Sequence, residues 1–170
     1  MLELISLDET DLQLLNHLQT DASQTNQALA ARVHISPPTC LRRVKRLTEA
    51  GLIERQIAIV STDKLAPLLG YGLTAISEVS LDRQGALELD SFERSAVQDP
   101  AVQQCYRTSP GPDFVLIAHV RDMPAWLALT QRLFTAQANV RNVKTYFSVK
   151  RAKFEPKVAL ALLDTAQAAI

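Results

Sequence analysis

The stretch HISPPTCLRRVKRL, residues 34–47, places two prolines ahead of four basic residues that fall within five positions. Ser36 is a favourable N-cap for a helix, and Pro37 would then occupy the first helical position, where its missing N–H is not needed. Gly51 suits the left-handed residue that commonly follows a helix. The stretch therefore predicts a helix that begins after Ser36 and carries a concentrated positive charge.

Two further helices are predicted ahead of this basic helix. One spans about residues 8–20, with Asp8 as its N-cap and leucines recurring at helical spacing. The other spans about residues 25–33 and is capped by Thr25. Only two residues separate it from the basic helix, and so short a turn makes the two helices cross steeply, as in a helix-turn-helix. His34 lies in this turn and is expected to have positive φ.

The basic residues of the third helix fall mostly on one side of a helical wheel. Cys40, Val44 and Leu47 cluster on the other side, flanked by Leu41, and are expected to face the core. In a helix-turn-helix the second helix of the motif enters the major groove of DNA. The expected DNA-contacting residues are Ser36, Pro38, Thr39, Arg42, Arg43, Lys45 and Arg46. The alternative is a solvated basic face, and Arg43, near the boundary, could instead pair with an acidic residue of the same domain.

Bulk composition limits the classes of function. Hydrophobic residues make up 47% and charged residues 21%, as in soluble globular proteins. The 18 Lys and Arg balance the 18 Asp and Glu, which argues against general polyanion binding but not against a local basic patch. No secretion signal or membrane-length apolar run is recognised, so a cytoplasmic protein is predicted. Cys40 and Cys105 lack metal-site spacing. Reduced thiols are expected, a disulfide is the alternative, and no metal or other cofactor is expected.

The second half of the chain alternates strands and helices in the order βαββαβ. The expected strands span residues 71–81, 101–109, 114–120 and 142–154, and the expected helices span 86–97 and 124–137. This order is that of the ferredoxin-like arrangement, a four-stranded antiparallel sheet with two helices on one face. The bare face, expected to carry Ile76 and Phe147, would need a partner, which predicts an oligomer.

The predicted fold class is therefore α+β. Residues 1–60 are predicted to form a winged-helix-like helix-turn-helix domain, in which three helices are followed by a strand over residues 52–60. Residues 61–70 form a linker rich in turn-forming residues, and residues 71–154 form the ferredoxin-like domain. Residues 155–170 form a helical tail.

The segment SPPTCLRRVKRLTEAGLIER, residues 36–55, follows LDETDLQLLNHLQTDAS and precedes the βαββαβ pattern. In this combination the chain resembles the leucine-responsive regulatory protein/asparagine regulator (Lrp/AsnC) family of bacterial and archaeal transcription regulators, over residues ~7–153. The resemblance implies homo-oligomers, either dimers or rings of four dimers (octamers), that present recognition helices to double-stranded DNA. It also implies that the second domain binds a small-molecule effector, usually an amino acid, and mediates oligomerisation.

The same resemblance places the effector region on RTSPGPDF, residues 107–114. Family members usually carry T/S-G-x-[FY]-D-[FY] here, whereas this chain has Pro110 in place of the glycine and Pro112 before the aspartate. The implied effector residues are Thr108, Ser109, Gly111, Asp113, Phe114, Met123, Tyr146, Phe147 and Ser148. Alternatively, Asp113 caps the turn, and Met123, Tyr146 and Phe147 pack in a core or an interface. The two prolines remove two N–H donors from the loop.

Three functions follow from these features. The expected one is a DNA-binding regulator that responds to an amino acid. The altered hairpin also allows a regulator that needs no effector, or that takes an unusual one. The third is an enzyme similar to the siroheme and haem-precursor decarboxylases, which have a similar two-part chain. Such an enzyme needs basic or histidine side chains converging on a tetrapyrrole, but of the three histidines His17 and His34 fall in the first domain and only His119 in the second. We therefore expect no enzyme.

Overall fold

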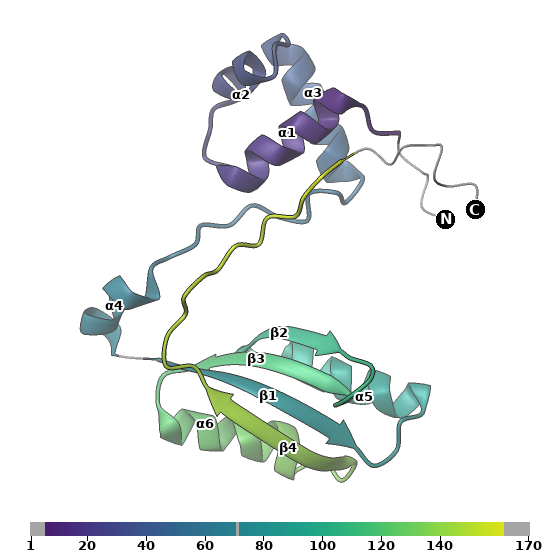
Figure 1. Cartoon of the computed structure of the whole chain (residues 1–170), viewed down its shortest axis with the longest axis vertical. Coiled ribbons are helices and arrows are strands. Elements are labelled where there is room, and N and C mark those ends of the chain that lie inside the picture. The colour runs from purple at the N-terminus through teal and green to yellow at the C-terminus, as the bar shows by residue number, and fades with distance from the viewer. Residues whose placement is uncertain (1–5, 71, 162–170) are drawn as a thin grey trace. The chain divides into compact units, whose positions relative to one another are not determined.

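The computed structural model describes residues 6–70 and 72–161, and the chain divides into two compact units (Figure 1). The helical unit combines the residues up to Ile59 with those from Lys153 onward, and the sheet unit spans Val60–Ala152. The C-terminal segment therefore belongs with the first helices and not with the sheet that precedes it. Within the described ranges, no helix has the length and apolar character needed to cross a membrane.

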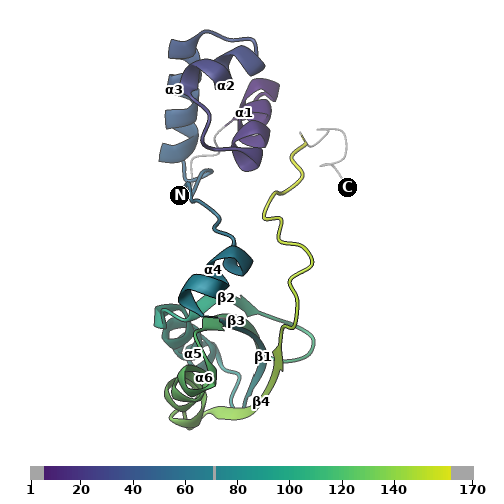
Figure 2. The same cartoon turned by 90° about the vertical axis from the view of Figure 1, so that its left-hand side faces the viewer.

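Three helices form the body of the helical unit (Figure 2). They are α1 (Glu9–Thr20), α2 (Asn26–Arg32) and α3 (Pro37–Glu49). Each begins at the predicted cap, because the side chains of Asp8, Thr25 and Ser36 accept hydrogen bonds from backbone N–H groups three residues further on. At α1 the cap is a reciprocal capping box, in which Asp11 also accepts from the N–H of Asp8.

The turn between α2 and α3 has the predicted geometry. His34 has a φ of 56° and Gly51, just beyond α3, has a φ of 72°. The three helices enclose a small core of the buried residues Leu14, Leu29, Ala30, Val33 and Cys40. The helix-turn-helix expectation is confirmed.

Two expectations for the connection after α3 are wrong. Residues 54–60 form no strand, because no other segment of the described chain pairs with their backbone. The expected linker contains α4 (Thr62–Leu69), which Ser61 caps through the N–H of Lys64. This cap and the residues that follow it favour a helix despite Pro67, which lies in its last turn.

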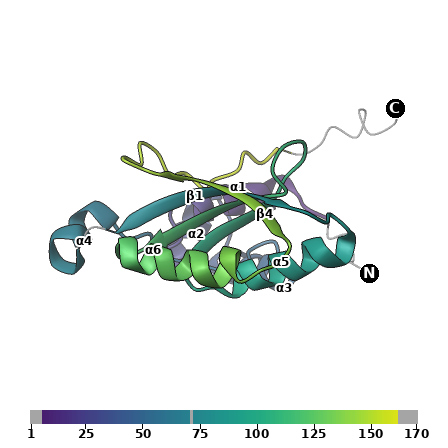
Figure 3. The same ribbon diagram turned by 90° about the horizontal axis from the view of Figure 1, so that it is seen from below.

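The sheet unit has the predicted βαββαβ order. Its elements are β1 (Leu73–Leu81), α5 (Ala86–Gln98), β2 (Val102–Arg107), β3 (Phe114–Val120), α6 (Met123–Thr130), the π-helix η1 (Gln131–Thr135) and β4 (Val140–Phe147). The strands form one antiparallel sheet in the order β2-β3-β1-β4. Both long helices lie on the same face of this sheet (Figure 3). The ferredoxin-like fold is thus confirmed, although β4 ends at Phe147 and not at residue 154.

Strand alternation separates a packed face from a bare one. In β3 every second residue is buried, and the Phe114 ring lies 4.8 Å from the Phe92 ring of α5. Ile76 and its cross-strand neighbour Tyr146 are on the bare face and are 36% and 44% exposed. Phe147 was expected there too, but it pairs with the buried Ala75 and therefore points toward the helices.

The described part of the C-terminal segment is not helical. Val158 donates its N–H to Gln19 Oε1 (2.8 Å) and accepts from Gln19 Nε2 (3.2 Å), so one side chain of α1 binds an extended backbone. Lys157 Nζ donates to Thr20 Oγ1 at 3.0 Å. The helical tail expected over residues 155–170 is therefore absent from residues 155–161, and the rest of it lies outside the described residues.

Candidate nucleic-acid interface and effector region

Helix α3 has one face against the core and one face in solvent. Cys40 and Leu47 are fully buried, whereas Pro38, Arg42 and Lys45 are exposed. Leu41 was expected beside the core but is 61% exposed, next to Arg42. A helical wheel predicts this exposure, because Leu41 is 100° away from Cys40 and on the same side as Pro38 and Lys45. Sequence reasoning thus missed an apolar side chain on the exposed face.

Two of the four basic residues of α3 are bound within the unit. Arg43 Nη1 donates to Asp11 Oδ1 at 2.8 Å and to Asp8 Oδ2 at 2.7 Å. Arg46 donates from Nη2 to Asp11 Oδ2 and from Nη1 to the carbonyl oxygen of Ser6 at 3.4 Å. For Arg43, the pairing with an acidic residue is what the structure shows. Arg46 was expected to point outward, but its guanidinium group lies against α1.

Asp11 is the centre of this ion-pair cluster and is only 1% exposed. Burial raises the pKa of Asp11, but the hydrogen bonds from Arg43, Arg46 and the Asp8 amide lower it by more, so that it lies below the usual 3.8. The hydrogen bonds that Arg43 donates to the carboxylates of Asp11 and Asp8 raise the pKa of Arg43. Asp11 and Arg43 are therefore both charged near neutral pH.

The remaining basic side chains of α3 are accessible. Lys45 Nζ is 3.6 Å from Glu49 Oε1, but both groups are exposed, and such a pair is easily exchanged. Arg42 is exposed as well. Ser36 is occupied as the helix cap, with its Oγ 2.8 Å from Thr39 Oγ1. The exposed face of α3 therefore presents Leu41 together with Arg42 and Lys45, beside the capped N-terminus.

The expected effector hairpin is a tightly bonded turn between β2 and β3. Thr108 donates its N–H to the Asp113 carbonyl oxygen (3.0 Å) and its Oγ1 to the Pro112 carbonyl oxygen (2.5 Å). The Ser109–Pro110 peptide bond is cis, and Gly111 has a φ of 124°. Ser109, Pro110 and Gly111 are exposed at the tip.

Asp113 ties this hairpin to the end of β1. Its N–H donates to the Val79 carbonyl oxygen (2.9 Å), and its Oδ2 accepts from the N–H of Leu81 (2.7 Å) and from Gln84 Nε2 (3.2 Å). Asp113 therefore has a structural role, as the turn-capping alternative supposed. Phe114 is fully buried in the core of the sheet unit.

The other expected effector residues lie at the opposite end of the sheet. Ser148 donates its N–H to the Thr74 carbonyl oxygen (2.9 Å), and Tyr146 and Phe147 pair with the same end of β1. Met123 begins α6 and is exposed there, just after β3 ends opposite Leu73. Leu81 is seven positions after Thr74 on β1, a distance of ~20 Å along the strand. Within one chain, therefore, the hairpin residues 108–113 do not lie close to Met123 or to residues 146–148.

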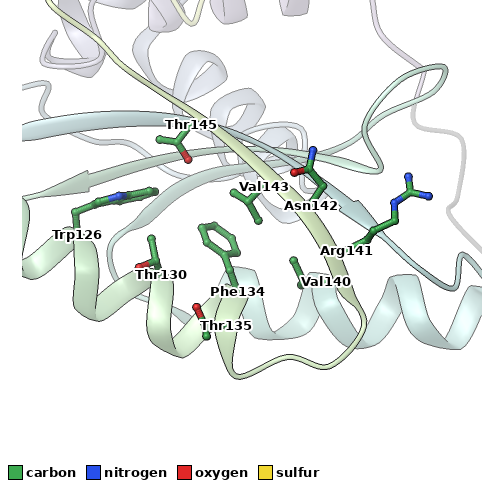
Figure 4. A pocket seen from close by; sticks show the side chains of 9 residues that line it. All are labelled: Trp126, Thr130, Phe134, Thr135, Val140, Arg141, Asn142, Val143 and Thr145. Atoms are coloured by element: carbon green, nitrogen blue, oxygen red, sulfur yellow. The ribbon is translucent and has the colours of Figure 1, made fainter.

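A cavity of about 360 Å³ lies between β4 and the helix formed by α6 and η1 (Figure 4). Trp126, Phe134 and Val143 supply apolar walls, and Thr130, Arg141 and Asn142 supply polar groups. Its volume is at the lower end of the range for small-molecule sites. None of the effector residues expected from the sequence lines it.

The remaining titratable candidates do not form a catalytic or metal cluster. His119 Nδ1 lies 3.2 Å from Thr74 Oγ1 on the sheet, whereas His17 and His34 belong to the helical unit. Cys40 and Cys105 are free thiols, and burial raises the pKa of each. Within residues 6–70 and 72–161, no group of His, Cys, Asp and Glu side chains is arranged to hold a metal ion.

Comparison with known families also gives two domains, although the second match extends past Ala152, where the sheet unit ends. The family model for a winged helix-turn-helix DNA-binding domain matches residues 7–54, and that for the Lrp/AsnC ligand binding domain matches residues 74–158. A leucine-responsive regulatory protein from Rhizobium meliloti is 34% identical over 149 residues, which cover 88% of this chain and 93% of that protein. An uncharacterized HTH-type transcriptional regulator from Haemophilus influenzae is 34% identical over 155 residues, with 91% and 90% covered. Both relatives carry the names of regulatory proteins.

Solved structures of similar proteins are also transcriptional regulators. A transcriptional regulator from Neisseria meningitidis, crystallised with L-Met, has a TM-score of 0.78 at 30% identity and covers 91% of this chain and 97% of its own. An AsnC family regulator from Agrobacterium tumefaciens has the same TM-score at 25% identity, with 90% and 97% covered. The helix-turn-helix, the ferredoxin-like unit and these relatives together show that the chain belongs to the Lrp/AsnC family of DNA-binding transcription regulators, with a domain for a small-molecule ligand.

Proposed function

We propose that this regulator binds duplex DNA through the exposed face of α3, acts in the cytoplasm as a homo-oligomer, and alters its DNA binding when an amino acid binds the sheet unit. The observation that carries the proposal is the division of α3 into a buried face and an exposed face that holds Leu41, Arg42 and Lys45.

The exposed face has the chemistry that DNA recognition requires. Arg42 and Lys45 can neutralise phosphates, and Arg42 can also reach a guanine edge in the major groove. Pro38, Leu41 and the methyl group of Thr39 supply apolar contacts of the kind that thymine methyl groups accept. Ser36 and Thr39 lie in the first turn, the part of a recognition helix that is nearest the bases.

The DNA contacts are tested by measuring affinity for genomic operator-length duplexes over a range of salt concentrations. The double variant Arg42→Gln with Lys45→Gln is expected to bind more weakly, with a log–log salt slope that is shallower by about 1.8 per helix engaged, because each phosphate contact contributes about 0.9. Arg94→Gln, an exposed change on α5 in the sheet unit, is the matched control. An unchanged slope in the double variant would show that α3 is not the DNA-contacting helix.

The bare face of the sheet supports the homo-oligomer. Ile76, Tyr106 and Tyr146 are large and exposed, and their cross-strand pairing puts them on the side away from the helices. A second copy of the sheet unit would cover these side chains. Ile76→Glu is expected to shift the protein toward monomers in sedimentation at micromolar concentration. A dimer of unchanged strength would place the interface elsewhere.

The effector is proposed to be an amino acid bound at the hairpin of residues 108–113. Two observations support this: the match to a ligand binding domain, and the L-Met bound by the Neisseria relative. Asp113 Oδ2 is occupied, and no donor of the described residues is recorded at Oδ1, which therefore remains as an acceptor for a ligand ammonium group. Because Met123 and Tyr146–Ser148 lie ~20 Å away in the same chain, their participation would require a second chain.

Calorimetric titration of the full-length protein with the twenty amino acids tests the effector. Asp113→Asn is expected to weaken the binding of the amino acid found by at least about tenfold, because it keeps an acceptor for the Leu81 N–H but loses the charge that pairs with an ammonium group. Arg141→Gln, in the cavity of Figure 4, is the control. If Arg141→Gln abolishes binding and Asp113→Asn does not, the cavity is the effector site. If no amino acid binds, the regulator is independent of such effectors, as the two prolines of the hairpin would allow.

A further inference from the structure

We propose that Asp11 is a positioning residue of the DNA interface: it holds Arg43 and Arg46 away from the phosphates, so that Arg42 and Lys45 are the basic groups of α3 that contact DNA. This inference rests on the proposed role of α3. It assigns a role to a carboxylate that lies on a different helix and does not itself touch DNA.

Both oxygen atoms of Asp11 are engaged, which fixes the orientation of the carboxylate. Oδ1 accepts from Arg43, and Oδ2 accepts from Arg46 and from the N–H of Asp8 at 3.2 Å. Asp11 is the third residue of α1, where the helix dipole also favours negative charge. The carboxylate therefore has no freedom to release one arginine and follow the other.

Burial makes the exchange of these arginines for phosphates unfavourable. Asp11 is 1% exposed, so if Arg46 moved to a phosphate, this buried carboxylate would lose one of its two arginine partners. The side chain of Arg43 is only 22% exposed, and it is held by two carboxylates. Lys45 differs, because its acidic partner among the described residues is Glu49, which is itself exposed to solvent.

The same contacts fix the rotation of α3 about its own axis. Arg43 and Arg46 are three residues apart and so lie on one side of the helix, about one turn from each other. Two bonds to a single buried group on α1 hold that side toward α1. The residues one position earlier, Arg42 and Lys45, are rotated by 100° and point into solvent. Asp11 thereby separates structural from DNA-contacting basic residues.

Removing two arginines from the phosphate contacts has a functional consequence. Phosphate contacts increase affinity for every sequence, whereas base contacts distinguish between sequences. A helix that presents two cations in place of four gives the base contacts more weight. Asp11 should therefore raise the ratio of specific to non-specific affinity.

The test compares the salt slopes of single variants of the full-length protein on one operator and on one unrelated duplex. Arg42→Gln should reduce the slope by about 0.9 per helix engaged. Arg46→Gln should change it by less than a third of that amount. Asp11→Asn should increase the slope, as Arg46 becomes available, and should lower the specific-to-non-specific ratio. Asp8→Asn is the matched control, since Arg43 is the arginine paired with Asp8, asparagine can still accept the Asp11 N–H as the cap of α1, and Asp11 still holds both arginines.

The test uses the ratio of the slope change in Arg46→Gln to that in Arg42→Gln. This ratio does not depend on how many copies of α3 contact the DNA, because that number multiplies both changes equally. If Arg46→Gln reduces the slope as much as Arg42→Gln does, Arg46 contacts phosphate and the inference is overturned while the role of α3 stands. If neither change affects the slope, the role of α3 fails and the inference fails with it. If circular dichroism shows that Asp11→Asn has lost its helices, that variant is unfolded and is left out. The comparison of Arg42→Gln with Arg46→Gln then tests the inference by itself.

Discussion

The two units of the chain are held together by different means. In the sheet unit, the described core is one continuous apolar cluster that extends from Ala75 on β1 to Phe134 on η1. In the helical unit, the apolar cluster is much smaller, and α1 is joined to α3 by the charges around the buried Asp11. A small unit cannot bury much apolar surface. The orientation of α3 therefore depends on a few charged groups, whereas the shape of the sheet unit depends on packing.

The largest expected effect comes from a cavity in the larger core. Phe114→Ala should lower the free energy of unfolding of the sheet unit by about 3–5 kcal/mol, because Phe114 is fully buried and its ring packs on Phe92. Denaturation followed by the fluorescence of Trp126, the only tryptophan of the chain, reports on this unit alone. Val97→Ala, at an exposed position of α5, should change little.

This variant also tests the independence of the two units. The amides of α1–α3 should keep their hydrogen-exchange protection in Phe114→Ala, at the same protein concentration. Equal loss of protection in α1–α3 would show that both units unfold together and that the comparison drawn above does not hold.

A smaller effect is expected from the charge of Asp11. At pH 7, Asp11→Asn should cost the helical unit about 2 kcal/mol, less than the ~3–5 kcal/mol of a fully buried pair, because both arginines remain partly exposed. The folded pKa of Asp11 lies below its usual 3.8. Its charge therefore stabilises the folded state above about pH 4, and that stabilisation is lost as the pH falls through the folded pKa.

The measurement is the difference in stability between wild type and Asp11→Asn, from hydrogen exchange of α1–α3 at several pH values. The difference should be constant from about pH 5 to 7 and should shrink below about pH 4. A difference that is the same at pH 3 and pH 7 would mean that the charge of Asp11 contributes nothing, and the helical unit would then depend on packing as the sheet unit does.

The smallest effect is expected at the turn between α2 and α3. His34 has positive φ, which costs a non-glycine residue about 1 kcal/mol or more. Glycine removes this cost, but its unfolded chain has more conformational entropy to lose, so only part of the gain remains. His34→Gly should therefore raise the stability of the helical unit by about 0.5 kcal/mol, measured by exchange in α2 and α3. His34→Val should lower it by about 1–2 kcal/mol. Equal effects of the two substitutions would indicate that the turn relaxes to negative φ.

Sequence reasoning succeeded where the determining signals are local. The caps Asp8, Thr25 and Ser36 and the left-handed His34 all follow from residues within four positions of one another. The order βαββαβ likewise follows from alternation and from turn-forming residues, and it specifies the sheet because few topologies accept that order.

The failures have a common origin in long-range partners. The wheel located Arg46 on the basic side of α3, but its partner Asp11 is 35 residues away, and no local pattern shows that pairing. Residues 54–60 have an alternating pattern, yet a strand also needs a neighbour. The effector residues, which come from a resemblance, lie at two ends of the sheet and stay a prediction.

The helical unit is built from both ends of the described chain, which affects how the two units can be separated. The sheet unit is inserted between two parts of the helical unit, since residues 153–161 return to α1, where Gln19 binds the backbone of Val158. A fragment ending at Ile59 would lack a strip of its own surface at Gln19 and Thr20. The smallest complete DNA-binding piece of this regulator is therefore not a contiguous stretch of sequence, and separating its two units requires two cuts and a new connection.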